Sequence, residues 1–266
     1  MGALRETLAK IQEDPGTLIF QIDLVSTNLA RTAIEDQPGH VAILAFFRLG
    51  GLFAMLEAEG RMDENQIRRE IVEVARSLYE RRLNCGYAGN LSVRVGDLIW
   101  VTPAAVPKHR LLPEQIVKVD LEGHPLSPGR PSSEAKMHYA VYRAKPSVGA
   151  IVHAHPPFST LVATSPIELP PILPEMEIVL GAVTWIPYAR PGTQKLADAV
   201  ACALAHAKFG ILLNHGALSV GRTLSEAFDF LEMGESLCQT HVYARLLGLT
   251  NTLPREDVRF FRQVTD

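Results

Sequence analysis

The sequence predicts an α/β layered fold. Segments with helical periodicity alternate along the chain with short runs rich in Val, Ile and Leu, and this interleaving is the first observation. The second is that the apolar runs end at Gly, Pro or Asn, as strands do. The third is composition: 266 residues, 47% of them hydrophobic, are enough to form a substantial core.

Residues 1–62 are predicted to form an N-terminal helical appendage. Its first helix stops at Asp14-Pro15-Gly16, and helical patterns resume over 18–34 and 41–59. Residues 41–56 are apolar on nearly all sides, so we expect the core or a neighbouring subunit to cover them. Residues 63–266 then form the main domain.

The main domain is predicted to begin with an amphipathic helix, because Ile67, Ile71, Val74 and Leu78 share one face. A β-hairpin and a third strand follow, and a helix leads into a buried strand that ends before Pro156. The predicted elements up to that point are helix 63–83, strands 90–95, 98–102 and 117–120, helix 133–143 and strand 148–155. The later elements are helix 159–164, a strand within 178–187, helix 193–206, strand 209–214 and its continuation 218–220, and helix 224–247.

Charge and cysteine usage exclude several classes of function. The formal net charge is −3, which gives no electrostatic reason to expect nucleic acid or a membrane surface as a partner. The most apolar segment, 40–56, is interrupted and too short to cross a bilayer, and the N-terminus lacks the pattern of a signal peptide. Three cysteines without a Cys-X-X-Cys pair are typical of a reducing compartment, so we expect a cytoplasmic protein.

A pair of histidines ends the predicted strand 148–155. Side chains two residues apart in a strand point to the same face, so His153 and His155 project together. Two imidazoles that converge on one point are typical of a transition-metal site. A lone His-X-His is equally compatible with two partly exposed histidines at a strand end, so the rest of the chain has to decide.

Two further residues complete a candidate metal site. Glu134 lies in the first turn of a predicted helix, and His215 follows a second buried strand. Three histidines and a carboxylate at the ends of elements can close around one divalent cation and leave room for substrate oxygens.

Seven short motifs, in this order, resemble the class II aldolase/adducin family over about residues 66–248. That family includes sugar-phosphate aldolases and epimerases. A match of seven motifs in order is far more specific than any one of them. The motifs are Gly89-Asn90, Thr102-Pro103, Pro131-Ser132-Ser133-Glu134, Val152-His153-Ala154-His155, Pro187-Tyr188, Gly192-Thr193 and Asn214-His215-Gly216.

The resemblance implies a three-layer α/β/α sandwich around a largely antiparallel sheet, and a homotetramer with active sites between subunits. It implies a divalent metal held by His153, His155 and His215, with zinc as the first choice and manganese, cobalt or Fe(II) as alternatives. Glu134 matches a carboxylate that ligates the resting metal and then transfers a proton as the catalytic acid/base. The implied activity is that of an aldolase or lyase acting beside a carbonyl through a metal-stabilised enediolate or enolate, decarboxylation included.

Candidate substrate-binding residues follow from the same motifs. Asn90, Ser132 and Ser133 match positions that hold the phosphate in sugar-phosphate aldolases, although capping and turn formation explain these residue types equally well. Arg190, in the loop before Gly192, could pair with a carboxylate or phosphate, or lie free in solvent.

The chain departs from the family pattern at Ala104-Ala105, where the sugar-phosphate aldolases have Thr-Gly. The loss of a hydroxyl donor predicts a weaker phosphate site and a small hydroxy- or oxo-carbonyl substrate, with an oxo acid as the first choice. Two other functions stay open. One is a non-haem iron oxygenase acting on an aromatic oxo acid on the same fold. The other is a non-catalytic adducin-like scaffold, against which the complete set of histidines and Glu134 argues.

Overall fold

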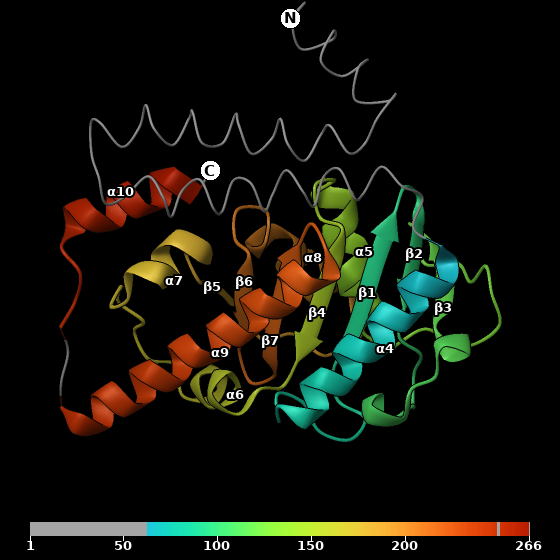
Figure 1. The fold of residues 1–266 in the computed structure, drawn as a ribbon, viewed down its shortest axis with the longest axis horizontal. Coiled ribbons are helices and arrows are strands. Elements are labelled where there is room, and N and C mark those ends of the chain that lie inside the picture. The colour runs from blue at the N-terminus through green and yellow to red at the C-terminus, as the bar shows by residue number, and fades with distance from the viewer. Residues whose placement is uncertain (1–62, 249–250, 266) are drawn as a thin grey trace, which may run out of the picture. The chain divides into compact units, whose positions relative to one another are not determined.

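The computed structural model describes residues 63–248 and 251–265. The appendage predicted at 1–62, with its apolar segment 41–56, lies outside these residues, so its helices and its role stay predictions. Within the described residues, strands and helices alternate as the sequence predicts (Figure 1).

The strands form one mixed sheet in the order β3-β2-β1-β4-β7-β6-β5. Every neighbouring pair is antiparallel except β5 and β6, which are parallel. The largely antiparallel sheet is therefore confirmed. The strands are β1 (Asn90–Val95), β2 (Leu98–Val101), β3 (Val117–Asp120), β4 (Ala150–Ala154), β5 (Thr184–Ile186), β6 (Phe209–Leu212) and β7 (Gly216–Gly221).

Helices cover both faces of the sheet, which confirms the three-layer α/β/α sandwich. One core lies between the sheet and α4, α6 and α9, and a second lies between the sheet and α5 and α8 (Figure 1). The α-helices are α4 (Glu64–Glu80), α5 (Ala135–Ala144), α6 (Pro157–Thr164), α7 (Pro174–Val179), α8 (Gln194–Ala203), α9 (Leu224–Leu247) and α10 (Arg255–Thr265), and the 3₁₀ turns are η1 (Lys108–Arg110) and η2 (Pro113–Gln115).

Strand β4 shows how the pleat divides its side chains between the two cores. Ala150, Val152 and Ala154 belong to the core under α9, whereas Ile151 belongs to the core under α5. Because successive strand residues face opposite sides, His153 lies on the side of Ile151. The histidine therefore faces the layer that contains α5.

Most of the predicted elements are present, with shifted ends, but residues 218–220 do not continue strand 209–214: they belong to β7, which turns back and pairs antiparallel with β6. Strands β1 and β2 form the expected hairpin, and α9 has the predicted bounds. Helix α5 begins at Ala135, two residues later than predicted, so Glu134 is its N-cap residue and does not lie in its first turn. The C-terminal helix α10 was not predicted; Arg262 fixes it by donating from Nε to Oε2 of the buried Glu177 on α7, at 2.7 Å.

Helix α9 is the longest helix in the described part of the chain and lies against the sheet (Figure 1). It approaches the sheet closely at Gly234, where an added Cβ would lie 2.4 Å from the ring of the fully buried Phe209. Neither α9 nor any other helix of the described residues combines the length and hydropathy needed to cross a membrane.

We expect Gly234→Ala to lower the free energy of unfolding by about 1–2 kcal/mol. Overpacking of a core costs roughly 1–3 kcal/mol, and the 2.4 Å approach to a buried ring places this site in the upper part of that range, at about 2–3 kcal/mol. The better helix propensity of Ala returns only about 1 kcal/mol. Denaturant unfolding would measure the change. Ser236→Ala, at an exposed position of the same helix, is the matched control and should be neutral or slightly stabilising. A Gly234→Ala protein as stable as the control would show that α9 can move away from the sheet.

Candidate metal centre

The four predicted metal ligands lie together at one edge of the sheet. Their ligand atoms, one from each of Glu134, His153, His155 and His215, all lie within 4.8 Å of one another. The three imidazole rings are 4.8–5.0 Å apart, centroid to centroid. We call these four residues the His₃Glu cluster.

The sheet brings the histidines together because β4 runs antiparallel to both of its neighbours. Its carboxyl end therefore meets the amino ends of β1 and β7. His153 pairs with Asn90 in the β1 register, and His155 follows the last residue of β4. His215 occupies the turn before β7, where Asn214 adopts a left-handed φ of 56° and donates its N–H to the carbonyl of Ala163 at 2.9 Å.

Glu134 reaches the histidines from α5. As the N-cap residue, it donates its backbone N–H to Oγ of Ser132 at 3.3 Å. Its two carboxyl oxygens lie 3.1 Å from Nε2 of His215 and 3.5 Å from Nε2 of His153. Asn90 Nδ2 donates to the Oε2 atom at 3.2 Å, so Asn90, which is 1% exposed, orients the carboxylate.

The hydrogen bond of His153 and the pKa of His155 favour the binding of a cation. Nδ1 of His153 lies 2.8 Å from the carbonyl oxygen of Ala217 and must donate to it, which leaves Nε2 with a free lone pair in the neutral ring. Burial, together with the charges of His153 and His215, lowers the pKa of His155 to about 3, so this ring is neutral at pH 7. Neutral imidazoles are the form that binds metals.

The Glu134 carboxylate stays ionised. Burial alone would raise its pKa, but hydrogen bonds and charge interactions with His153 and His215 outweigh burial and lower the pKa below the ordinary range. Nδ1 of His215 is buried and has no hydrogen-bond partner among the described residues, and the buried Oε1 of Glu134 has no contact of that kind apart from Nε2 of His215 at 3.1 Å. Several lone pairs facing one another, with an unsatisfied oxygen among them, fit a divalent cation.

The other predicted substrate residues, Ser132, Ser133 and Arg190, differ in the contacts that they make. Ser132 donates its backbone N–H to Thr102 O at 3.0 Å, and an added Cβ at Gly192 would lie 2.9 Å from Ser133 O. The loop that contains Arg190 therefore passes next to Ser133. The Arg190 side chain is exposed and makes no ion pair with the described residues.

Two polar residues near the cluster were not singled out by the motifs. Lys108 is 4% exposed and donates from Nζ to Val106 O at 2.9 Å and Tyr87 O at 3.4 Å. Burial lowers its pKa to about 8, and the charge of Glu134 opposes that shift. His138 is fully buried on α5, and its Nδ1 lies 2.7 Å from Ser92 Oγ. A buried lysine in a proline-flanked loop gives no periodic signal, and only the tertiary structure places it here.

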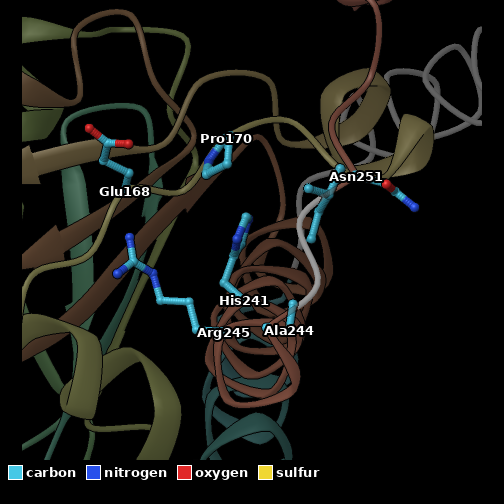
Figure 2. A pocket seen from close by; sticks show the side chains of 8 residues that line it. Glu168, Pro170, His241, Ala244, Arg245 and Asn251 are labelled. Carbon is cyan, nitrogen blue, oxygen red and sulfur yellow. The ribbon is translucent and has the colours of Figure 1, made fainter.

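A separate cavity of about 430 Å³ lies between α9 and the loop after α6 (Figure 2). Its lining includes Glu168, His241 and Arg245, but none of the His₃Glu cluster. His241 is 4% exposed, and burial lowers its pKa. This cavity is therefore a different region of the described chain from the metal centre.

The match to known proteins agrees with this geometry. The family model described as Class II Aldolase and Adducin N-terminal domain matches residues 69–242. The chain belongs to this family. Membership confirms both the resemblance and the predicted enzyme class, a metal-dependent lyase of the class II aldolase type.

Two relatives and one solved structure show how far the similarity of this chain to known proteins extends. An L-fuculose phosphate aldolase of Methanococcus maripaludis is 33% identical over 170 residues, which is 64% of this chain and 93% of the relative. A 3-oxo-tetronate 4-phosphate decarboxylase of Haemophilus influenzae is 36% identical and covers 61% of this chain and 80% of its own length. The crystal structure of YgbL from Escherichia coli superposes with a TM-score of 0.70 at 29% identity, over 75% of this chain and 99% of YgbL.

We expect the metal-free class II aldolase to lose stability on acidification between about pH 6.5 and pH 3, partly through His138. Burial, with the charge of His153, lowers the pKa of His138 to about 3, and Glu134 offsets this only in part. The unfolded chain takes up this proton near pH 6.5, so it binds more protons than the folded chain throughout that window. Stability must then fall as the pH falls, by up to about 1.4 kcal/mol per pH unit for one proton.

The measurement is the free energy of unfolding of chelator-treated protein at several pH values from 7 to 5. His138→Asn removes one of the titrating groups and should give a shallower slope than the wild type. Parallel slopes for the two proteins would contradict the assignment of this proton to His138.

Proposed function

We propose that this class II aldolase is a zinc-dependent lyase that breaks or forms a carbon–carbon bond beside a carbonyl, with a small oxo acid as its substrate. The observation that carries the proposal is the His₃Glu cluster. It combines three imidazoles with an ionised carboxylate that has an unsatisfied oxygen. A divalent cation held there would supply a Lewis acid for the carbonyl oxygen of a substrate.

The roles of the protein groups follow from where they lie. His153, His155 and His215 would hold the cation through ring nitrogens, and Glu134 would supply the negative charge. Glu134 is the catalytic acid/base, which removes a proton from the substrate and returns one at the carbon next to the carbonyl. Asn90 would keep the Glu134 carboxylate in place through its 3.2 Å hydrogen bond.

Aldol cleavage and decarboxylation both require this site to stabilise a developing enolate. Each breaks a bond one carbon away from the carbonyl and leaves an electron pair that the carbonyl must accept. The names of the relatives include both reactions, an aldolase and a decarboxylase of an oxo acid phosphate. The shared family thus supports a lyase, and the choice between the two reactions depends on the substrate.

The backbone at Ala104-Ala105 favours a substrate without a phosphate. Ala104 already donates its N–H to Arg130 O at 2.9 Å, and Ala105 adopts a φ of 58°, the left-handed region that glycine favours. Neither residue has a hydroxyl to offer. The hydroxyls of Ser132 and Ser133 remain for one anionic group, and Arg190 is a candidate second anchor for a carboxylate.

The metal site can be tested first. We expect the purified protein to hold about one zinc ion per chain, because the four ligand atoms already lie close enough to share it. The double variant His153→Ala, His155→Ala should lose the metal in elemental analysis. The control His124→Ala removes an exposed histidine that pairs with Asp120 and should keep it. Full metal retention by the double variant would exclude this site.

The reaction is tested by comparing 2-oxo and 3-oxo acids with fuculose and ribulose phosphates, using metal-loaded enzyme while oxygen is monitored. We expect turnover of an oxo acid without oxygen uptake. The phosphates should react about tenfold to a hundredfold more slowly, because each lost hydrogen bond to a charged group costs about 1.5–3 kcal/mol. Glu134→Gln should keep the metal and lose about 10²- to 10⁴-fold in turnover.

Two outcomes of this comparison would overturn parts of the proposal. Efficient turnover of the phosphates alone would exclude the oxo-acid substrate while keeping the lyase. Bound iron with oxygen uptake would instead identify a non-haem iron oxygenase.

A further inference from the structure

A buried carboxyl group caps the N-terminus of α6, the helix that follows the proposed metal ligand His155. Glu235 of α9 is 7% exposed, and both of its oxygens accept hydrogen bonds from this helix. Oε1 accepts the backbone N–H of Phe158 at 2.7 Å, and Oε2 accepts the backbone N–H and the hydroxyl of Ser159, each at 2.7 Å.

These bonds complete the hydrogen bonding of the first turn of α6. The first N–H groups of a helix have no partner within the helix. Pro156 and Pro157 have no N–H, and Thr160 donates to Pro156 O at 2.8 Å. The two donors that remain, on Phe158 and Ser159, are the ones that Glu235 accepts. A negatively charged group is also favoured at this end of a helix by its dipole.

His155 needs such external support more than His153 does. His153 is oriented by its own hydrogen bond to Ala217 O at 2.8 Å. Among the described residues, His155 has no hydrogen bond outside the His₃Glu cluster, where its Nε2 lies 3.2 Å from Nε2 of His153. The position of its ring therefore depends on the backbone on either side.

That backbone is fixed at both ends. Before His155 lies the last residue of β4, which pairs with β7, and the backbone of β7 is close enough that a Cβ added to Gly216 would lie 2.7 Å from Cδ2 of His155. After His155 come the two prolines and the turn held by Glu235. Loss of the Glu235 contacts would release only the second of these supports.

We infer that Glu235 is a positioning residue for the metal ligand His155, acting through the first turn of α6. The inference rests on the proposed function to the extent that His155 ligates the metal. It assigns to Glu235 an effect on metal affinity in addition to its effect on stability. Groups that orient metal ligands typically change metal affinity about 10- to 100-fold when they are replaced.

The test is the zinc affinity of the folded full-length chain, measured by competition with a chelating indicator well below the unfolding temperature. Glu235→Gln is nearly isosteric, but it turns one acceptor into a donor that faces a backbone N–H. We expect about tenfold weaker zinc binding, the lower end of the range for groups around a metal site. Ser159→Ala removes one of the three bonds, and the loss of affinity should be smaller and in the same direction.

Thr223→Ala is the matched control, because Thr223 caps α9 itself by accepting the N–H of Glu226 at 3.1 Å and lies at the far end of the helix from the metal centre. It should lower stability without changing zinc affinity. If Glu235→Gln and Ser159→Ala both bind zinc with wild-type affinity, the inference is wrong, whatever the stability of the variants. If Glu235→Gln does not fold, the zinc affinity of Ser159→Ala alone decides. A wild-type chain that binds no zinc would instead overturn the proposed function.

Discussion

The antiparallel placement of β4 between β1 and β7 is the constraint on which the metal centre depends. It brings the carboxyl end of one strand to the amino ends of two others, and so places His153 next to Asn90 and close to His215. Helix α5 supplies Glu134 from the layer that His153 faces. Four electron-pair donors then face one another within 4.8 Å, an arrangement that is favourable only when protons or a cation lie between them.

The backbones of the strands that meet at the His₃Glu cluster are closely packed. A Cβ at Gly89 would lie 2.6 Å from His153 O, and one at Gly216 would lie 2.6 Å from Ala154 O. Larger residues at either position would push apart the strands that carry the ligands. The ends of these strands are thus tightly packed where the His₃Glu cluster lies, and Asn90 and the carbonyl of Ala217 contact two of its side chains directly.

Periodic patterns predicted the elements that bury one face. The hairpin of β1 and β2 follows from them, because a strand with one buried face alternates apolar and polar residues. The helix Leu224–Leu247 also has the predicted bounds, although its buried side includes the polar residues Glu235 and His241. Helix α10 was missed; in the structure Val258 of this helix is buried and Arg262 pairs with Glu177 on α7. The stretch 178–187 contains the expected strand β5, but its first residues end α7.

The sequence by itself determined that His153 and His155 share one face, because the period of a strand is fixed by its backbone geometry. It also indicated Glu134 and His215 as partners through their places at the ends of elements. Only the tertiary structure decided that Glu235 holds the turn after His155, and that Lys108 is buried near the cluster. Glu235 lies 76 residues from Ser159 in the chain, and a contact over such a separation is set by how α9 packs on α6, which no local pattern encodes.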